Sequence, residues 1–172
     1  MNNTLNTIKN RRSYKKFSNE MIDRNLIRKV VEAGTFAPTG MNKQSPIILV
    51  ITNKRVRDKL SRLNASIMNK DIDPFYGAPV VLVVLADKSI PTYIYDGSVV
   101  IENMLLAAES LGLGACWIHR AKEEFELEEG KEILKELGIV GDYEGIGHCI
   151  LGKRIDEGRQ HTIKDNYVFY ID

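Results

Sequence analysis

The chain alternates segments of helical hydrophobic spacing with short apolar runs. A first helix is expected between Ser18, a residue type that favours N-caps, and Pro38, which disfavours helical geometry in the residue before it. A second is expected over residues 56–67, where apolar positions recur every three or four residues. The apolar positions of the two helices are Ile22, Leu26, Ile27, Val30 and Val31, and Val56, Leu60, Leu63 and Ile67.

Four runs rich in apolar and β-branched residues predict strands. The first two are apolar throughout, which is typical of strands buried in a sheet. The chain closes with "YVFYI" (167–171), an aromatic stretch that we expect at a sheet edge or against another subunit. The predicted strands span residues 47–52, 79–87, 115–119 and 145–152.

Residues 95–111 predict a helix that is apolar nearly all round, which belongs in the centre of a fold or at a subunit interface. Residues 125–138 predict a solvent-facing helix that ends at Gly138. Regular alternation of helices and strands favours a doubly wound parallel sheet. The apolar central helix and the apolar tail equally suit an α+β sheet that a second subunit completes, and the pattern leaves both open.

Length and composition predict one domain over residues 1–172, with the composition of a soluble globular protein. The formal net charge of +1 gives no overall basic field for nucleic acid. The apolar runs are too short to span a membrane, and the first ten residues lack a hydrophobic signal core. Two cysteines do not form a secreted disulfide framework, so we expect a cytoplasmic protein.

The stretch "NRRSYKKF" (10–17) concentrates Arg11, Arg12, Lys15 and Lys16 around the hydroxyl of Ser13. Such a cluster is compatible with a solvated terminus, with nucleic-acid binding or with capture of one phosphate. A second basic patch, which nucleic-acid binding favours, is missing from the sequence. Phosphate suits the chemistry, because guanidinium groups present forked donors and Ser13 adds a hydroxyl.

The stretch "APTGMNKQSP" (37–46) predicts an irregular loop, since it holds two prolines and a glycine. Its amide side chains, Asn42 and Gln44, offer donors and acceptors together, which suits the edge of a heterocycle. Satisfying nearby backbone groups is the plainer alternative.

Other constellations are weaker. A zinc site from Cys116, His119, His148 and Cys149 is disfavoured, because side chains alternate along strands and would face opposite sides. The glycine-rich stretches do not form the dinucleotide fingerprint, and the phosphate-loop and nucleophile-elbow motifs are missing too.

Taken together, the motifs resemble the small FMN-dependent nitroreductases. "RRSYKKF" is similar to the family's R-R-S-x-R-x-F opening, and "APTGMNKQSP" to its A-P-S-G-x-N-x-Q-P-W loop. "IENMLLAAESLGLGACWI" resembles its interface helix and following strand, and "EGIGHCILG" its closing strand. The resemblance implies an α+β fold with a mostly antiparallel sheet flanked by helices. It also implies a homodimer that binds FMN between its subunits, each subunit adding a C-terminal strand to the other's sheet.

The resemblance assigns roles residue by residue. Arg11, Arg12 and Ser13 match positions that hold the FMN phosphate, ribityl chain and pyrimidine edge, and Lys15 stands where an arginine is usual. Asn42 and Gln44 match loop positions beside the flavin ring of the other subunit. In the tail, Arg159, His161 and Lys164 are the candidates for a further phosphate contact. Backbone groups beside the reactive flavin nitrogen are implied at Trp117, Ile118 and His119.

Two residues depart from the family pattern, because Ser45 replaces a proline and Pro46 a tryptophan. The implied reaction passes a hydride from NADH or NADPH to FMN and then to a small electron-poor acceptor, a nitroaromatic or a quinone, in a ping-pong cycle. The flavin carries that chemistry, so no side chain is singled out as catalytic. A flavin-binding store or sensor with little turnover is the alternative.

Overall fold

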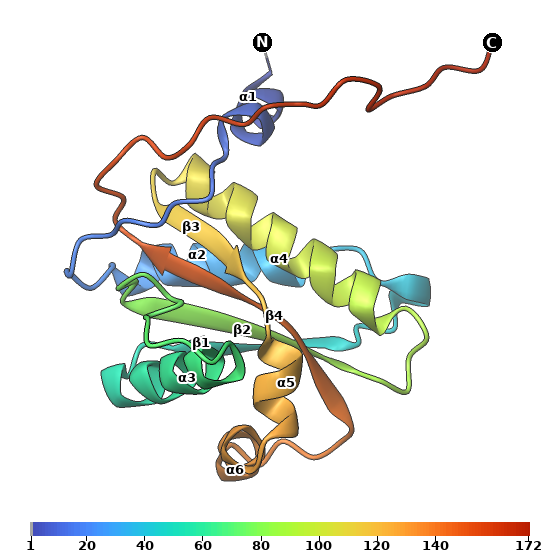
Figure 1. The fold of residues 1–172 in the computed structure, drawn as a ribbon. Helices are drawn as coiled ribbons and strands as arrows, with labels where there is room; N and C mark the ends of the chain where they lie inside the picture. Colours follow the sequence, from blue (N-terminus) through green and yellow to red (C-terminus); the bar gives the residue numbers. More distant parts are fainter. Residues whose placement is uncertain (1) are drawn as a thin grey trace.

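The computed structural model describes residues 2–172, and Figure 1 shows how its helices and strands are arranged. The helices are α1 (Asn3–Asn10), α2 (Arg24–Thr35), α3 (Lys54–Ile67), α4 (Tyr93–Ser110), α5 (Ala121–Glu126) and α6 (Glu128–Glu136), with a 3-10 turn, η1, at Gly40–Asn42. The strands are β1 (Pro46–Ile51), β2 (Val80–Asp87), β3 (Gly114–Ile118) and β4 (Tyr143–Gly152).

The four strands form one antiparallel sheet in the order β1-β2-β4-β3. This arrangement decides between the two architectures that the hydrophobic pattern leaves open. The doubly wound parallel sheet is wrong, and the α+β sheet flanked by helices is confirmed. The strands β1 and β3 are the two edges, so the backbone of β3 pairs on one side with β4 and leaves its other side to different partners.

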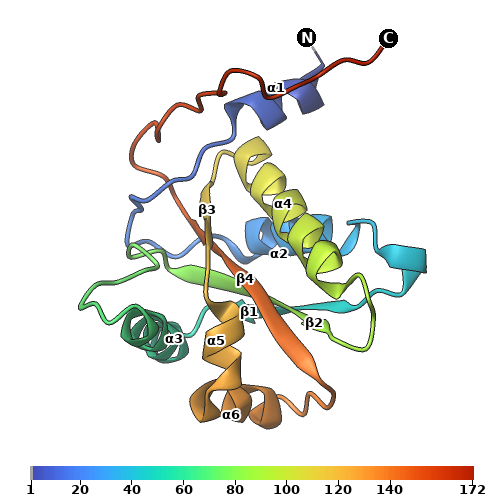
Figure 2. The ribbon, with the colours of Figure 1, turned by 45° about the vertical axis from the view of Figure 1, so that its right-hand side comes forward.

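Helices cover both faces of the sheet, as Figures 1 and 2 show from two sides. One face packs on α3, α5 and α6, and the other packs on α2 and α4. Residues 80–85 of β2 are fully buried and alternate between the two cores, which confirms the expectation from its apolar run. The first core contains Leu60, Val81, Val83, Phe125 and Ile133, and the second contains Val30, Leu82, Val84, Ile101 and Met104.

Strand β1 corrects one prediction. Its apolar run predicts a buried strand, but β1 lies at the sheet edge and the side chain of Val50 is 46% exposed. Leu49 and Ile51 point into the first core instead. An apolar run therefore does not distinguish a central strand from an edge strand that leaves some apolar side chains uncovered.

The start of α2 corrects another. Ser18 is not its N-cap, because the helix begins at Arg24 and the side chain of Asp23 accepts the N–H of Asn25 at 2.6 Å. The Ser18 hydroxyl instead accepts the N–H of Glu20 in a bend. The helical spacing misleads here because Ile22, which is buried, belongs to the extended segment before the helix. The helix ends at Thr35, before Pro38, as expected.

Two further helices differ from the pattern. The single helix expected over residues 125–138 is wrong, since α5 and α6 are separate and the backbone at Leu127 is extended. The hydrophobic pattern also misses α1, which has no buried residue and begins at an Asn2 side chain that accepts the N–H of Thr4. A helix without a buried face gives no core signal.

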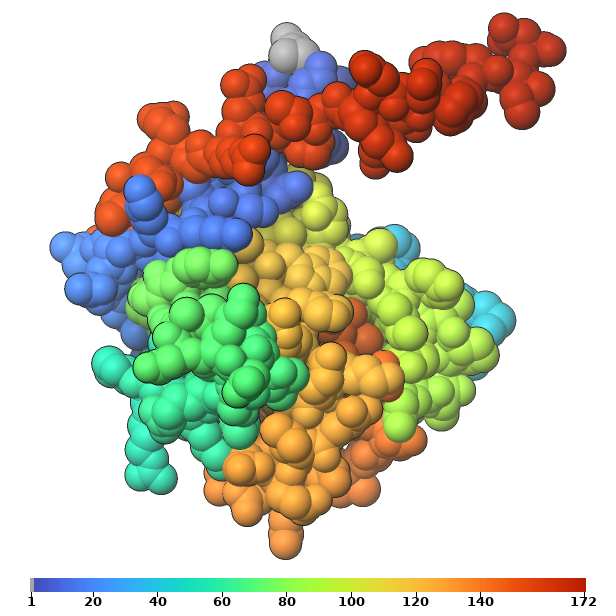
Figure 3. Space-filling model, in the orientation of Figure 1, coloured from blue at the N-terminus to red at the C-terminus, as the bar shows by residue number. Residues whose placement is uncertain are grey.

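The tail after β4 crosses above the body of the molecule, alongside α1 and onward past it (Figure 3). Its last residues, 167–171, are exposed and form no strand in this chain. Within residues 2–172, no helix has both the length and the apolar content needed to cross a bilayer.

Candidate functional site

A cavity of about 270 Å³ opens between the segment that follows α1 and the first part of the tail. We call it the cationic cavity. None of the residues that line it carries a carboxylate, so nothing in its lining opposes the binding of an anion. The lining residues are Arg11, Arg12, Ser13, Arg159, Gln160, His161 and Thr162.

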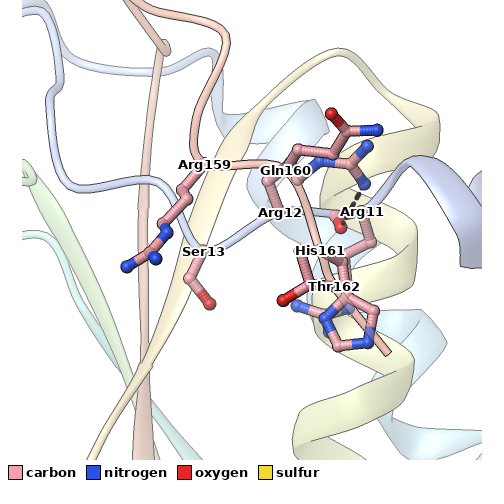
Figure 4. A pocket seen from close by; sticks show the side chains of 7 residues that line it. All are labelled: Arg11, Arg12, Ser13, Arg159, Gln160, His161 and Thr162. Atoms are coloured by element: carbon pink, nitrogen blue, oxygen red, sulfur yellow. Dashed lines mark hydrogen bonds between the residues drawn. The ribbon is translucent and has the colours of Figure 1, made fainter. Parts of the chain in front are cut away.

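The guanidinium groups of this cavity spread in different directions, as Figure 4 shows. Arg12 donates to the carbonyl oxygens of Lys9 at 2.8 Å and of Arg11 at 2.9 Å, both close to the end of α1. The Nε atom of Arg11 lies 3.6 Å from a carboxylate oxygen of Glu102 on α4. A guanidinium has five N–H donors, so each group keeps donors for a ligand.

Tyr14 fixes the segment that carries Arg11–Ser13 to the edge of the sheet. Its N–H donates to the carbonyl of Ala115 at 3.0 Å, on the free side of β3. The Tyr14 side chain is buried, and its hydroxyl contacts both Glu109 and Arg154, which form an ion pair at 3.1 Å. Burial and the neighbouring carboxylate raise the pKa of Tyr14, so the phenol stays protonated. The segment that carries Arg11–Ser13 is thereby anchored to the sheet.

A second cavity of about 320 Å³ lies at the end of β3, and we call it the strand-end cavity. Ser13 lines both cavities, so they meet at this residue. The structure therefore brings seven sequence-predicted residues to one continuous site beside Arg11 and Arg12. The strand-end cavity is lined by Ser13, Lys15, Met68, Ile72, Pro74, Tyr76 and Cys116–Arg120, the last range including Trp117, Ile118 and His119.

Cys116 shows how close the charged residues come to this cavity. Burial raises the pKa of its thiol, while a hydrogen bond with Ser13 and the positive charges of Lys15 and Arg11 act in the opposite direction. The ammonium of Lys15 also lies 5.3 Å from the ring centre of Tyr76. The cationic cluster thus reaches from the first cavity into the second.

The wall formed by residues 68–76 was missed by the sequence analysis. These residues connect α3 to β2, and their charged residues, Lys70, Asp71 and Asp73, match none of the motifs considered. A signal was available, because "DPFYG" (73–77) places a proline and two aromatic residues directly before the most buried strand. Phe75 enters the core, whereas Tyr76 is 40% exposed and has a positive φ of 52°.

The loop with Asn42 and Gln44 lies elsewhere, in a third cavity of about 570 Å³ between α2, α4 and β1. A buried carboxylate, Asp96, holds this loop: it accepts the N–H of Gly40 at 2.9 Å and the hydroxyl of Ser45 at 2.8 Å. The hydroxyl of Thr92 donates to it at 3.0 Å. Ser45 therefore has a structural role that a proline could not supply.

The amide groups of Asn42 and Gln44 are exposed and contact one another at 3.3 Å. Asp96 near one end of α4 holds their loop, while Glu109 near the other end holds Tyr14. At 1.5 Å per residue these anchors lie roughly 20 Å apart along the helix. Within one chain, the structure does not bring Asn42 and Gln44 to the cavities that Ser13 lines.

The tail candidates separate in the same way. Arg159 and His161 line the cationic cavity. Lys164 lines neither cavity, and its ammonium lies 6.0 Å from the ring centre of Tyr167. Lys16 is exposed and lies 3.8 Å from Asp156.

Cys149 and its neighbour His148 lie on opposite faces of the sheet, and Cys116 belongs to the same core as Phe75. Cys149 belongs to the core under α2 and α4, while the ring of His148 lies against Phe75 and Glu124 on the other face. Residues 2–172 hold no group of three or more histidine, cysteine or acidic side chains placed to bind a metal ion.

Comparison with known proteins supplies the family. The sequence pattern of the Nitroreductase family matches residues 8–153. A relative from Methanothermobacter thermautotrophicus, which carries the proposed name NADH dehydrogenase/NAD(P)H nitroreductase, is 32% identical over 118 residues. That match covers 66% of this chain and 59% of the relative, so the chain spans about three fifths of the relative's length.

Two crystal structures of nitroreductases with bound FMN have similar folds over their whole length. The Bacteroides fragilis protein superposes with a TM-score of 0.90 at 26% identity, and the Desulfitobacterium hafniense protein with 0.90 at 27% identity. In both cases the match covers 100% of each chain. The antiparallel sheet is consistent with the similar folds of these structures. Because the family pattern matches residues 8–153, the chain belongs to the nitroreductase family.

Proposed function

We propose that this protein is an FMN-dependent oxidoreductase that takes a hydride from NADH or NADPH and delivers it to a small electron-poor acceptor. The observation that carries the proposal is the junction at Ser13, where a cationic cavity without carboxylates meets a cavity lined by the end of β3 and partly by apolar side chains. FMN has the same two-part character, with a phosphate at one end and a flat heterocycle at the other. The FMN bound to the two similar crystal structures supports the assignment.

The residues present fit this cofactor. Arg11, Arg12 and Arg159 would hold the phosphate, because guanidinium groups pair with phosphate oxygens through forked hydrogen bonds. Ser13, at the junction, would contact the ribityl chain, and Lys15 would face the pyrimidine edge. The backbone of Trp117, Ile118 and His119 would lie along the ring. The third tail candidate, Lys164, has no place in this arrangement as the chain stands.

When bound, the flavin would accept and release the hydride. The chain's own groups bind and orient. Positive charge from Lys15 and backbone N–H groups at the end of β3 would stabilise negative charge that develops on the ring. Apolar side chains such as Ile72 and Pro74 would exclude water from the strand-end cavity. Because one cavity would receive donor and acceptor in turn, we propose a ping-pong cycle with a nitroaromatic or quinone acceptor.

The same proposal includes a homodimer. Asn42 and Gln44 lie roughly 20 Å along α4 from the cationic segment, so they would reach a flavin only in a partner subunit. Residues 167–171 leave an unbroken apolar stretch in water, which is typical of an interaction segment and would add a strand to the partner's sheet. The free, buried thiols of Cys116 and Cys149 fit a cytoplasmic location.

The absorption spectrum of the purified protein tests the proposal. We expect flavin bands, either as purified or after incubation with FMN, that bleach with NADH or NADPH without oxygen and return with a quinone. A protein that never binds FMN would contradict the proposal. Flavin that binds but does not bleach would indicate the store or sensor instead. Arg12→Ala should lose FMN while the far-UV circular dichroism stays unchanged.

A further inference from the structure

A buried polar cluster lies directly behind the strand-end cavity. It consists of Asn64 on α3, Glu124 on α5 and His148 on β4, each with no exposed surface. The Nε2 atom of His148 lies 3.0 Å from a carboxylate oxygen of Glu124, and the side-chain amide of Asn64 donates to the other oxygen. Neither the anchoring of the sheet nor the proposed cofactor contacts use these side chains.

The cluster ends on two backbone carbonyls. The Nδ1 atom of His148 lies 3.2 Å from the carbonyl oxygen of Ile118, and the Asn64 amide donates to the carbonyl oxygen of His119 at 2.8 Å. Both carbonyls therefore point inward, away from the cavity. In a trans peptide the N–H points opposite to the C=O, so the N–H groups of His119 and Arg120 point outward.

Those N–H groups belong to residues that line the strand-end cavity. In the part of the chain that the structure describes, neither donates to a backbone carbonyl outside the strand and helix ladders. Arg120 also has a left-handed backbone, with φ 79°, which a residue with a side chain adopts only when its surroundings enforce it. The two inward hydrogen bonds hold the two peptides that lead into this residue.

We propose that Asn64, Glu124 and His148 are positioning residues that aim the N–H groups of His119 and Arg120 into the strand-end cavity as paired donors for the bound heterocycle. This inference rests on the proposed function, because it takes the heterocycle to be that of FMN. N–H donors aimed at the ring would stabilise negative charge that it gains on reduction. Their correct aim favours the reduced over the oxidised cofactor.

The geometry also places two protons. The Nδ1 atom of His148 faces a carbonyl and must carry a hydrogen, and Nε2 faces a carboxylate oxygen, so a second proton lies between Nε2 and Oε2 of Glu124. A glutamine at residue 124 can take over this contact by donating its amide to Nε2 while its oxygen accepts from Asn64. A methionine of similar length cannot.

The experiment measures FMN affinity and midpoint potential in wild type, Glu124→Met, Glu124→Gln and Asn64→Leu. We expect Glu124→Met and Asn64→Leu to weaken binding of the reduced cofactor about tenfold more than that of the oxidised cofactor. A tenfold difference lowers a two-electron midpoint potential by about 30 mV. Glu124→Gln should stay within twofold of wild type in both quantities. If Asn64→Leu does not fold, Asn64→Ala removes the same donor with less crowding and carries the same expectation.

Leu60→Ala is the matched control, since Leu60 is fully buried one turn earlier on α3 and its apolar side chain cannot donate to either carbonyl. It should lower the melting temperature and leave the midpoint potential unchanged. Unaltered potentials in folded Glu124→Met and Asn64→Leu, or a shift in Leu60→Ala as large as theirs, would overturn the inference. Wild type that binds no FMN would instead overturn the proposed function, so the two failures are distinguishable.

Discussion

The two faces of the sheet are built differently. The face under α2 and α4 is closed by apolar side chains, and its buried polar groups, Asp96 and Ser45, lie at the end where the 37–46 loop is attached. The face under α3, α5 and α6 contains a band of buried polar side chains within its core. That band consists of Arg57, Ser61, Asn64, Glu124 and His148.

The polar groups lie where loops next to cavities must be held. Asn64 and His148 bind the backbone at the end of β3, and Arg57 binds the carbonyl of Ala78 at 3.1 Å while its guanidinium pairs with Asp73 at 2.5 Å. Hydrophobic packing is not directional, whereas a hydrogen bond fixes both distance and angle. The comparison indicates that the apolar face mainly stabilises the fold, whereas the polar face orients the backbone of the loops beside the cavities.

The strongest way to break the comparison is His148→Phe. The change leaves one carboxylate oxygen of the buried Glu124 without its His148 partner, while Asn64 still donates to the other oxygen. We therefore expect a loss of about 3–5 kcal/mol in the free energy of unfolding, measured by urea denaturation. The double variant Glu124→Met/His148→Phe replaces both groups with apolar ones and should recover at least half of that loss. Losses in the double variant equal to the sum of the two single losses would contradict this account.

Asp96→Ala tests the polar anchor of the other face. It leaves the N–H of Gly40 and the hydroxyls of Ser45 and Thr92 without their acceptor, and should cost about 1–3 kcal/mol. Ser45→Ala removes one donor only and should cost less. Equal costs for the two variants would show that the carboxylate does not organise the loop.

The same anchor predicts a pH dependence. Burial alone raises the pKa of Asp96, but hydrogen bonds from Gly40, Ser45 and Thr92 outweigh it and hold the pKa below its usual value. A lowered folded-state pKa stabilises the protein above the unfolded value of about 3.9, and this stabilisation is lost as the pH falls through the folded value. The difference between wild type and Asp96→Ala should therefore shrink below about pH 4 and stay constant from pH 5 to 8.

The sequence predicts the two faces unequally. The strands, the apolar α4 and the helix over 54–67 follow from hydrophobic spacing, because packing against a core repeats along the chain. Part of the cationic cavity could also be predicted from the sequence, since three of its lining residues, Arg11, Arg12 and Ser13, are adjacent in the chain. The antiparallel strand order could not be predicted, because the local hydrophobic pattern carries no information on which strands pair.

The polar band could not be predicted for a similar reason. Asn64, Glu124 and His148 are far apart in sequence. Asn64 and Glu124 look like ordinary surface residues there, and His148 lies within a predicted strand. His148 was considered only as a metal ligand, and the helix break at Leu127 that sets α5 against β4 gives no glycine or proline signal. The break places Glu124 in the core rather than in water.

Ile101→Val sharpens the comparison from the apolar side. Ile101 is fully buried on α4, and removing one methyl group should cost about 0.5–1.5 kcal/mol without altering FMN affinity. The result is read from urea denaturation together with flavin fluorescence. A change in FMN affinity above twofold would mean that apolar packing also helps to orient the groups that bind the cofactor.

Arg120→Gly has the smallest expected effect on stability, and it tests most directly what orients the N–H groups of His119 and Arg120. The left-handed backbone at Arg120 costs about 1–2 kcal/mol for a residue with a side chain, and glycine would remove that cost. Glycine also raises the entropy of the unfolded chain, which costs about 0.5–1 kcal/mol, so the net change should stay within about 1 kcal/mol. Because the inward hydrogen bonds at Ile118 and His119 remain, the N–H groups should stay aimed and FMN affinity should change less than twofold. A large loss of FMN affinity in this variant would mean that the Arg120 side chain itself contacts the cofactor, and the buried polar cluster would then not be the main source of aim.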